Sequence, residues 1–225
     1  MARAMSKRLS PRIRDRKKSQ SAPTKARVGV AVSPMKRALL TSIPIIQALE
    51  EISVKGDLEL AGVEVVPHIF ENGGCYSETK GVFVGHRGMT KAEVAEILPI
   101  ASVPNSMEKG WWMESTRESE TQLELRVTRT VEWILETAWS NTYDVLIVVS
   151  HQDFACKCMN RLTDSHCFNW LYNTSLSSFT LHRLPLDPNA SENQHADSNV
   201  AHLHPCAVVI DWINSVDHLS PENIK

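Results

Sequence analysis

The chain has 225 residues, a formal net charge of -2 and 42% hydrophobic residues, values that suit one globular domain with a sizeable core. No run approaches the ~18 apolar residues that a membrane helix needs, and the first residues lack the apolar stretch of a secretory signal. The five cysteines are odd in number and scattered, which indicates reduced thiols and not a disulfide framework. We therefore expect a cytoplasmic protein with no membrane partner.

The first 27 residues differ in charge from the rest of the chain. They carry ten Lys and Arg side chains and one acidic side chain, so their net charge of +9 leaves -11 for the remainder. A stretch rich in Lys, Arg, Ser and Pro cannot bury enough apolar surface to order itself, so we predict a disordered tail at 1–27. Met5, Leu9 and Ile13 also stand at helical spacing, as in an organelle transit peptide, but Pro11 interrupts that helix. Nucleic-acid binding is disfavoured because no aromatic residues interleave with the basic ones.

The first half of the domain predicts strands that alternate with helices. Residues 28–32 form a β-branched strand, and Ser33 and Pro34 provide an N-cap and a first helical position for the helix that follows. Residues 58–66 form a second strand, which ends at Pro67. Residues 72–118 are mixed and are expected to form an excursion over the sheet, with a short helix within 89–98.

The second half of the domain gives clearer signals. Apolar residues recur every three or four positions over 118–139, which predicts a helix. The continuously apolar run 145–149 is typical of a central strand covered on both faces, and a helix is expected at 154–162. Further strands are predicted at 178–184 and 207–211, with a polar loop at 187–204 between them. Residues 28–225 are thus expected to form a three-layer α/β/α domain with a mostly parallel sheet.

Three polar residues lie a few positions after the ends of predicted strands. Arg37 lies in the first helical turn after the first strand, Glu71 follows the second strand, and His151 follows the central strand. Ligands of open α/β sheets bind beyond the carboxyl ends of the strands, where helix N-termini present unpaired N–H groups. Arginine offers a planar fork, protonated histidine a second charge-assisted bond, and a carboxylic acid can protonate a leaving oxygen. The set favours a site for a phosphate monoester.

Two motifs in these segments match a known family. The run Ser33-Pro34-Met35-Lys36-Arg37-Ala38-Leu39-Leu40-Thr41 resembles the second-arginine motif of the histidine phosphatases, which include the phosphoglycerate mutases. Val148-Val149-Ser150-His151 resembles their second-histidine motif, although Gln152 stands where the family usually has glycine. Weaker similarities cover Pro67 to Gly74, Asn173-Thr174-Ser175 and Asn214 to Leu219, in order along residues 28–219.

The resemblance implies a phosphoglycerate mutase-like fold and a role for each candidate residue. Arg37 and His151 would hold the phosphoryl group, and Glu71 would be the general acid, with Glu64 and Glu78 as nearby alternatives. The expected partner is a phosphorylated small molecule or another phosphate ester, with no cofactor and no metal. Trp111 and Trp112 are expected to pack in the structure, and their segment is a candidate cover for the site.

The family's nucleophile is absent from this sequence. It is a histidine in an Arg-His-Gly motif on a first strand, and none of the nine histidines here follows an arginine; His86-Arg87-Gly88 has the reverse order. The chain enters the family pattern at Arg27, so the family's first strand is expected to be absent as well. We therefore expect a protein of this kind that acts on or binds phosphate monoesters with little or no turnover, or, as an alternative, a non-catalytic pseudoenzyme that binds phosphate or another partner. An active phosphatase or mutase with another nucleophile, and a chain that is incomplete at its N-terminus, remain as alternatives.

Cysteine and histidine residues suggest two other sites. Cys156, Cys158, His166 and Cys167 contain zinc-ligating groups, but residues two apart on a helix point to different sides and the spacing is not that of a zinc ribbon. Cys75 could form a thiol nucleophile with His151 only if the fold brings the two together. Both hypotheses are disfavoured.

Overall fold

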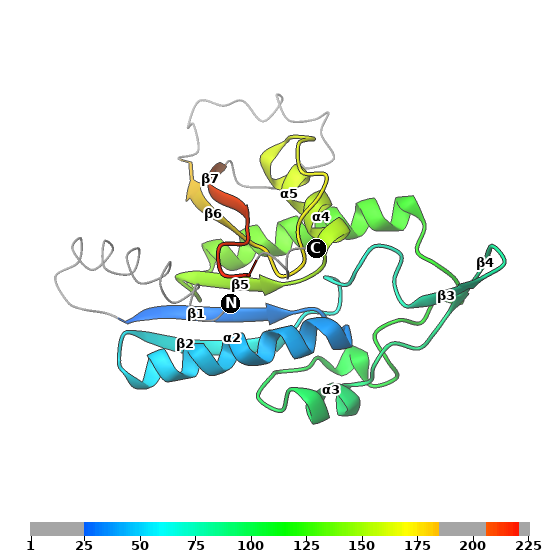
Figure 1. Cartoon of the computed structure of the whole chain (residues 1–225), viewed down its shortest axis with the longest axis horizontal. Coiled ribbons are helices and arrows are strands. Elements are labelled where there is room, and N and C mark those ends of the chain that lie inside the picture. The colour runs from blue at the N-terminus through cyan, green and yellow to red at the C-terminus, as the bar shows by residue number, and fades with distance from the viewer. Residues whose placement is uncertain (1–24, 185–205, 221–225) are drawn as a thin grey trace.

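A computed structural model describes residues 25–184 and 206–220 as a mixed α/β protein (Figure 1). The central sheet has three parallel strands in the order β2-β1-β5. These strands are β1 (Ala26–Val32), β2 (Leu58–Val65) and β5 (Val145–Val149). In the middle of the sheet, Val30 of β1 lies opposite Val63 of β2 and Ile147 of β5. The predicted α/β class with a parallel sheet is confirmed. The predicted tail up to residue 24 and the predicted loop at 187–204 lie outside the described residues.

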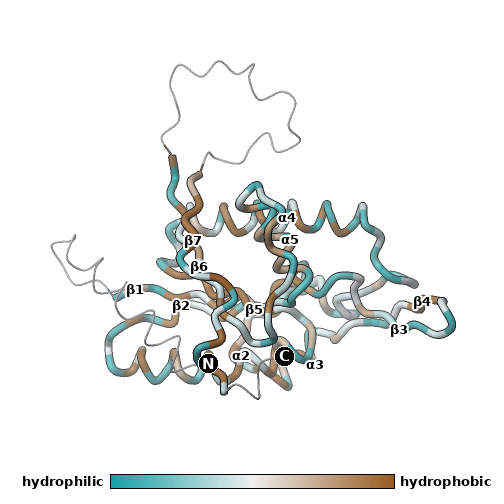
Figure 2. The backbone as a smooth tube through the Cα atoms, turned by 45° about the horizontal axis from the view of Figure 1, so that its top comes forward, coloured by the Kyte–Doolittle hydropathy of each residue, from teal (hydrophilic) through white to brown (hydrophobic). Residues whose placement is uncertain are grey.

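Helices cover both faces of this sheet. On one face, Val28, Val30 and Val32 pack into an apolar cluster with residues of α2 (Lys36–Val54) and α3 (Lys91–Ile97). On the other face, Ala31 packs with residues of α4 (Glu120–Trp139) and α5 (Gln152–Thr163). The predicted helices match α2, α3, α4 and α5 closely. Figure 2 shows why α4 was readable from sequence, since hydrophobic residues recur along it between hydrophilic ones.

The strand β5 is not central, which corrects the sequence prediction. Its residues do face apolar clusters on both sides, because Val145 and Ile147 pack toward α2 and Leu146 packs toward α4. Within the described residues, however, only β1 pairs with it, so β5 is an edge strand and Val148 is 39% exposed. A continuous apolar run predicts that both faces of a strand are covered, but it does not predict whether a strand pairs with it on one side or on both.

The start of α2 also differs from the prediction. The helix begins at Lys36 with Met35 as its N-cap, and no side chain caps it. Ser33 lies two residues before this N-cap and is fully buried. Its hydroxyl accepts a long hydrogen bond from the Met35 N–H (3.3 Å) and makes a shorter contact with His151, described below. Ser33 therefore lies directly after β1 and does not cap α2.

The excursion between β2 and α4 contains structure that the sequence analysis did not predict. Before the predicted helix α3 it holds the antiparallel hairpin of β3 (Tyr76–Thr79) and β4 (Val82–Gly85), and after α3 a 3-10 turn at Asn105–Met107. The hairpin turn is Lys80-Gly81, and both residues have positive φ, as a two-residue hairpin requires.

A second antiparallel hairpin joins β6 (Leu176–Arg183) to β7 (Cys206–Ser215), near the predicted positions of the last two strands. Leu181 of β6 and Cys206 of β7 pack against the apolar cluster of α4 and α5. Among the described residues, no helix has the length and apolar character needed to cross a membrane.

Candidate phosphate site

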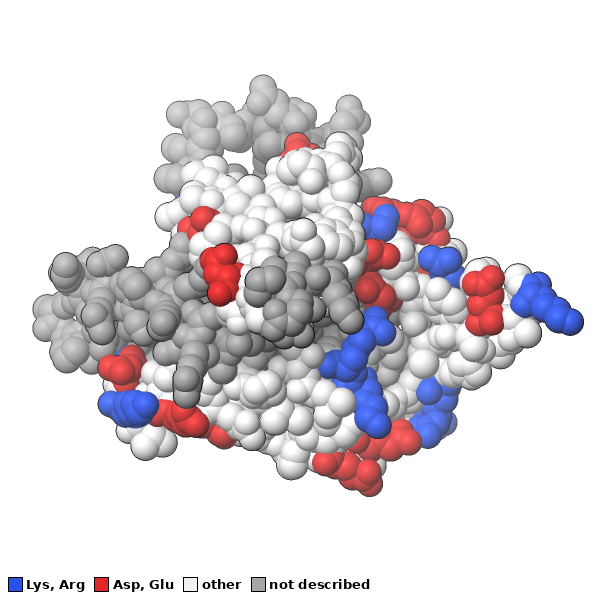
Figure 3. Space-filling view, viewed as in Figure 1, with Lys and Arg blue, Asp and Glu red and all other residues white. Residues whose placement is uncertain are grey.

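Arg37, Glu71 and His151 meet where β1 and β5 end. Arg37 is the second residue of α2, His151 is the N-cap residue of α5, and Glu71 lies in the loop after β2. The Nε atom of Arg37 lies 3.0 Å from Nδ1 of His151, and its Nη2 lies 3.8 Å from Oε2 of Glu71. Figure 3 shows Lys and Arg side chains gathered at the start of α2, with acidic side chains beside them. Parallel strands that end at one sheet edge thus bring together the three residues selected from sequence.

Both ring nitrogens of His151 form hydrogen bonds. Nδ1 accepts from Arg37, because a guanidinium has only donors, so Nε2 carries the ring proton and donates to the Ser33 hydroxyl at 2.7 Å. Burial, the Arg37 charge and the Arg126 charge together lower the pKa of His151 to about 3. His151 is therefore neutral at pH 7 without a ligand, whereas the sequence analysis assigned it a protonated ring.

Ser33 is the site residue that sequence reasoning missed. Its backbone N–H donates to the Val149 carbonyl at 2.9 Å, which fixes the end of β1 against the end of β5. Its hydroxyl then meets His151, which lies 118 positions further along the chain. The signal was present in the sequence, since Ser33 also directly follows a strand, but an N-cap role accounted for it equally well.

Glu71 has a structural role in addition to its place near Arg37. Its Oε1 accepts from the backbone N–H of Asn72 at 2.8 Å and from that of Phe154 at 3.1 Å. Phe154 is the third residue of α5, and His151 gives this helix no side-chain cap. Glu71 thus caps α5 from a distant loop, which satisfies one of the unpaired N–H groups of the helix. Its Oε2 is left for Arg37 or for a ligand.

The two alternative acids lie on strands. Glu64 is part of β2 and forms an isolated bridge with Ser102, whereas Glu78 is an exposed residue of β3. Neither has a hydrogen bond or ion pair to Arg37 or His151 in the described structure. The geometry therefore favours Glu71 among the three candidates.

The loop that carries Glu71 is fixed by a buried ion pair. Arg126 of α4 binds Glu118 through two bonds of 2.7 and 2.6 Å, and its Nη1 donates to the Phe70 carbonyl at 2.8 Å. The Arg126 guanidinium also stacks between the rings of Phe70 and Phe154, at 3.7 and 4.0 Å from their centroids. Phe70 directly precedes Glu71, so Arg126 helps to set the position of the acid.

The two adjacent tryptophans support the same loop. Trp112 is buried with its ring edge-on to Phe70, 5.4 Å between centroids, and Trp111 lies 5.0 Å from Phe70. Gly74 makes room for Trp112, because a Cβ atom there would lie 2.5 Å from the tryptophan ring. The contacts of this pair are those of packing residues beneath the loop.

Gln152, the departure from the family pattern, turns toward a neighbouring segment. With its amide oriented to satisfy its neighbours, it donates to the Leu171 carbonyl at 3.1 Å and accepts from the Trp170 indole at 2.9 Å. These contacts hold the side chain on the 170–171 segment, so it does not lie between Arg37 and His151.

Two of the weaker family-like segments also lie together. The Tyr172 N–H donates to the Asn214 side chain at 2.7 Å, and the His218 ring is 3.0 Å from the Thr174 carbonyl. The segment around Asn173-Thr174-Ser175 thus contacts Asn214 to Leu219, although about 40 residues separate them in the sequence.

Cys156 and Cys158 of α5 pack into different apolar clusters. Cys156 belongs to a cluster with Phe168 and Leu171, whereas Cys158 belongs to the cluster of α4 and α5, as expected for residues two apart on a helix. Burial is the main cause that raises the pKa of the thiols of Cys75 and Cys156, and it raises that of Cys158 to about 12. Within residues 25–184 and 206–220, no group of three or more His, Cys, Asp and Glu residues is arranged to hold a metal ion.

The reversed motif has its own local role. Arg87 forms two hydrogen bonds with Glu93, at 2.8 and 2.9 Å, and His86 lies 2.7 Å from the Ser77 hydroxyl. These partners come from α3 and β3, outside the Arg37 and His151 site.

No protein-family model matches the chain, and no curated protein is significantly similar to it.

Proposed function

We propose that this chain is a phosphoglycerate mutase-like, histidine phosphatase-related protein that binds phosphate monoesters and has little or no turnover. The observation that carries the proposal is the hydrogen-bonded series Ser33, His151 and Arg37 at the ends of two parallel strands. The Nε–H of Arg37 donates to His151, which leaves the two Nη groups for other partners. The Arg37 side chain is 61% exposed, so an oxyanion can reach these groups. Its contact with Glu71 is long, at 3.8 Å, and exposed on the Arg37 side, so a phosphate can replace it at small cost.

A bound phosphate would also raise the low pKa of His151. Its low pKa arises from burial and from two nearby arginines, and a dianion beside Arg37 offsets that positive charge. The N-terminal end of α5, which has no side-chain cap from His151, lies close by as an additional donor group. The site is therefore suited to a doubly charged phosphate monoester more than to a singly charged anion.

The neighbouring nucleophiles support binding over catalysis. Both ring nitrogens of His151 are occupied, so neither has a lone pair directed at a ligand. Ser33 is fully buried, and the thiols of Cys75 and Cys156 have raised pKa values, which keeps them protonated and weakly nucleophilic. A covalent phosphoryl intermediate would need an activated attacking group.

Calorimetric titration with inorganic phosphate tests the binding proposal. Arg37→Ala is expected to weaken binding at least about tenfold, since it removes charge-assisted hydrogen bonds worth about 1.5 to 3 kcal/mol. Lys36→Ala is the matched control, because Lys36 is an exposed cation in the same helical turn without a contact to His151. Equal losses in the two variants would show that only general positive charge matters.

Steady-state hydrolysis of phenyl phosphate tests the second part of the proposal. We expect no hydrolysis above the background rate from the wild-type chain. Turnover that disappears in both Arg37→Ala and His151→Ala would overturn the non-catalytic proposal and favour an active phosphatase.

A further inference from the structure

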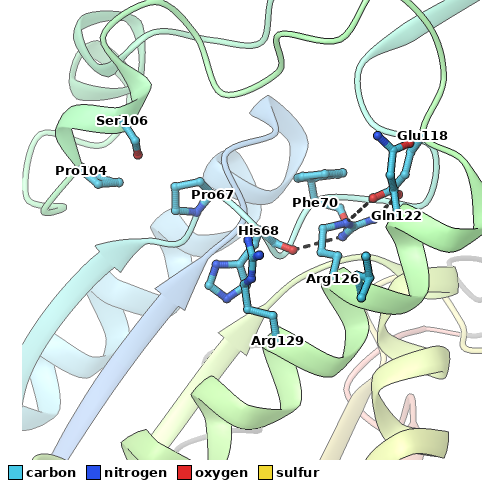
Figure 4. A pocket seen from close by; sticks show the side chains of 10 residues that line it. Pro67, His68, Phe70, Pro104, Ser106, Glu118, Gln122, Arg126 and Arg129 are labelled. Atoms are coloured by element: carbon cyan, nitrogen blue, oxygen red, sulfur yellow. Dashed lines mark hydrogen bonds and ion pairs between the residues drawn. The ribbon is translucent and has the colours of Figure 1, made fainter. Parts of the chain in front are cut away.

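A cleft separate from the Arg37 site lies alongside α4. Its volume is about 570 Å³, within the ordinary range for small-molecule sites. One wall is α4, and the opposite wall consists of the segments around Pro67 to Phe70 and Pro104 to Ser106 (Figure 4). Neither Arg37, Glu71 nor His151 is among its lining residues.

The lining of the cleft is apolar with a few converging polar groups. Pro67, Phe70, Pro104 and Leu125 provide the apolar surface, and Leu125 is an exposed large hydrophobic residue. The polar groups come from Ser106, Gln122 and the basic residues described next. An apolar body with one polar group is the kind of ligand that such a lining accommodates.

The charges of the cleft are not balanced. The charge of Arg126 is matched by Glu118, and this pair turns away toward one end of the cleft (Figure 4). Arg129, one helical turn further along α4, has an exposed side chain and no ion pair with any residue that the structure describes. The cleft therefore retains one unmatched positive charge.

His68 lies next to this charge and has an unused polar atom. Its ring packs edge-on against Trp133, and its Nε2 is buried without a hydrogen-bond partner among the described residues. Burial is the main cause that lowers the pKa of His68 to about 4, and the charges of Arg129 and Arg126 add to this effect. Figure 4 shows His68 and Arg129 side by side at the end of the cleft opposite Glu118.

We infer that this cleft binds a small organic anion, with its charged group between Arg129 and His68 and its apolar part against Pro67, Phe70 and Leu125. The anion would neutralise Arg129 and give the buried His68 nitrogen a hydrogen-bond acceptor. The Arg129 side chain can move to admit it, since it is exposed and has no ion pair with any residue that the structure describes. This site does not depend on the proposed phosphate site.

Benzoate is a suitable probe, because it combines one carboxylate with a flat apolar ring and is not a phosphate ester. Calorimetry and histidine ring NMR signals of the full chain should show saturable binding that shifts the His68 signals. The pKa of His68 should rise from about 4 toward its ordinary value of 6.5 as benzoate binds. Binding should persist in Arg37→Ala, which separates this site from the phosphate site.

Two arginine variants decide the assignment. Arg129→Ala should weaken benzoate binding about tenfold or more, as expected for loss of a charge-assisted hydrogen bond. Arg161→Ala, which removes an exposed arginine in the last turn of α5, should change the affinity by less than about twofold. Three results would each overturn the inference: no saturable binding, full affinity in Arg129→Ala, or shifts confined to the His151 signals.

Discussion

The Nε atom of Arg37 donates to Nδ1 of His151, although arginine and histidine are both potential cations. The contact is favourable only because His151 is neutral, with its proton on Nε2 and directed at Ser33. The site therefore holds a neutral histidine beside a permanent positive charge.

Removing the Ser33 hydroxyl should release this arrangement. Ser33→Ala leaves the buried Nε2–H of His151 without an acceptor, so we expect the free energy of unfolding to fall by about 1 to 3 kcal/mol. Ser42→Ala is the matched control, since Ser42 is also fully buried but donates only to the Leu39 carbonyl of its own helix. Urea unfolding measures both variants. Equal, small losses would mean that the contact between Ser33 and His151 contributes little.

One buried histidine, His151, and one partly buried histidine, His68, should make the protein sensitive to acid. His151 and His68 have folded-state pKa values of about 3 and about 4, below the ordinary value of 6.5. The unfolded chain therefore binds protons first as the pH falls. Their full contribution to stability is present above about pH 6.5 and is lost progressively toward pH 4 and pH 3, by at most about 1.4 kcal/mol per pH unit for each histidine.

His68→Phe tests this pH dependence, because phenylalanine keeps the aromatic contact with Trp133 and the buried Nε2 of His68 has no hydrogen bond to lose. The variant should gain stability relative to the wild type between pH 6 and pH 4 in urea unfolding at several pH values. A constant difference in unfolding free energy across that range would contradict the lowered pKa of His68.

The elements and the three main site residues could be predicted because they depend on local signals. Arg37, Glu71 and His151 each follow a strand, and strand ends can be read from hydrophobic pattern and turn residues. The position of β5 at the sheet edge could not be read in this way, because pairing depends on the arrangement of all the strands.

The remaining parts of the site depend on contacts between distant segments. The contact of Ser33 with His151 and the capping of α5 by Glu71 each link residues more than 80 positions apart. Glu118 and Arg126 are eight residues apart, a spacing that signals no pair on its own because Glu118 precedes the helix. Their pairing follows from burial under Phe70 and Phe154, which only the folded structure supplies.

The ion pair of Glu118 and Arg126 should be important for stability. Both side chains are at most 8% exposed, so Glu118→Gln or Arg126→Met leaves an uncompensated buried charge or unpaired carbonyls, at an expected cost of about 3 to 5 kcal/mol. The double variant should lose less than the sum of the two single losses. Arg87→Ala is the control, because the Arg87 and Glu93 pair is exposed and should leave the unfolding free energy nearly unchanged.

The outcome for phosphate binding separates two roles of this pair. Because Arg126 holds the Phe70 carbonyl beside Glu71, Arg126→Met should also weaken phosphate binding at temperatures where the variant is folded. Unchanged phosphate affinity in a folded Arg126→Met variant would restrict the pair to a role in stability.

Gly74, in the loop after Glu71, should be intolerant of any side chain. Gly74 and Gly81 both have left-handed backbone conformations, with φ of 82° and 78°, so alanine at either position costs about 1 to 2 kcal/mol in backbone strain. A Cβ atom at Gly74 would also lie 2.5 Å from the Trp112 ring, whereas one at Gly81 has no neighbour within 4 Å. Gly74→Ala should therefore lower the free energy of unfolding by clearly more than Gly81→Ala in urea titrations. The Gly74 N–H donates to the Glu71 carbonyl, so Gly74→Ala should also weaken phosphate binding. If Gly74→Ala is instead as stable as Gly81→Ala, Trp112 does not pack against this loop as described.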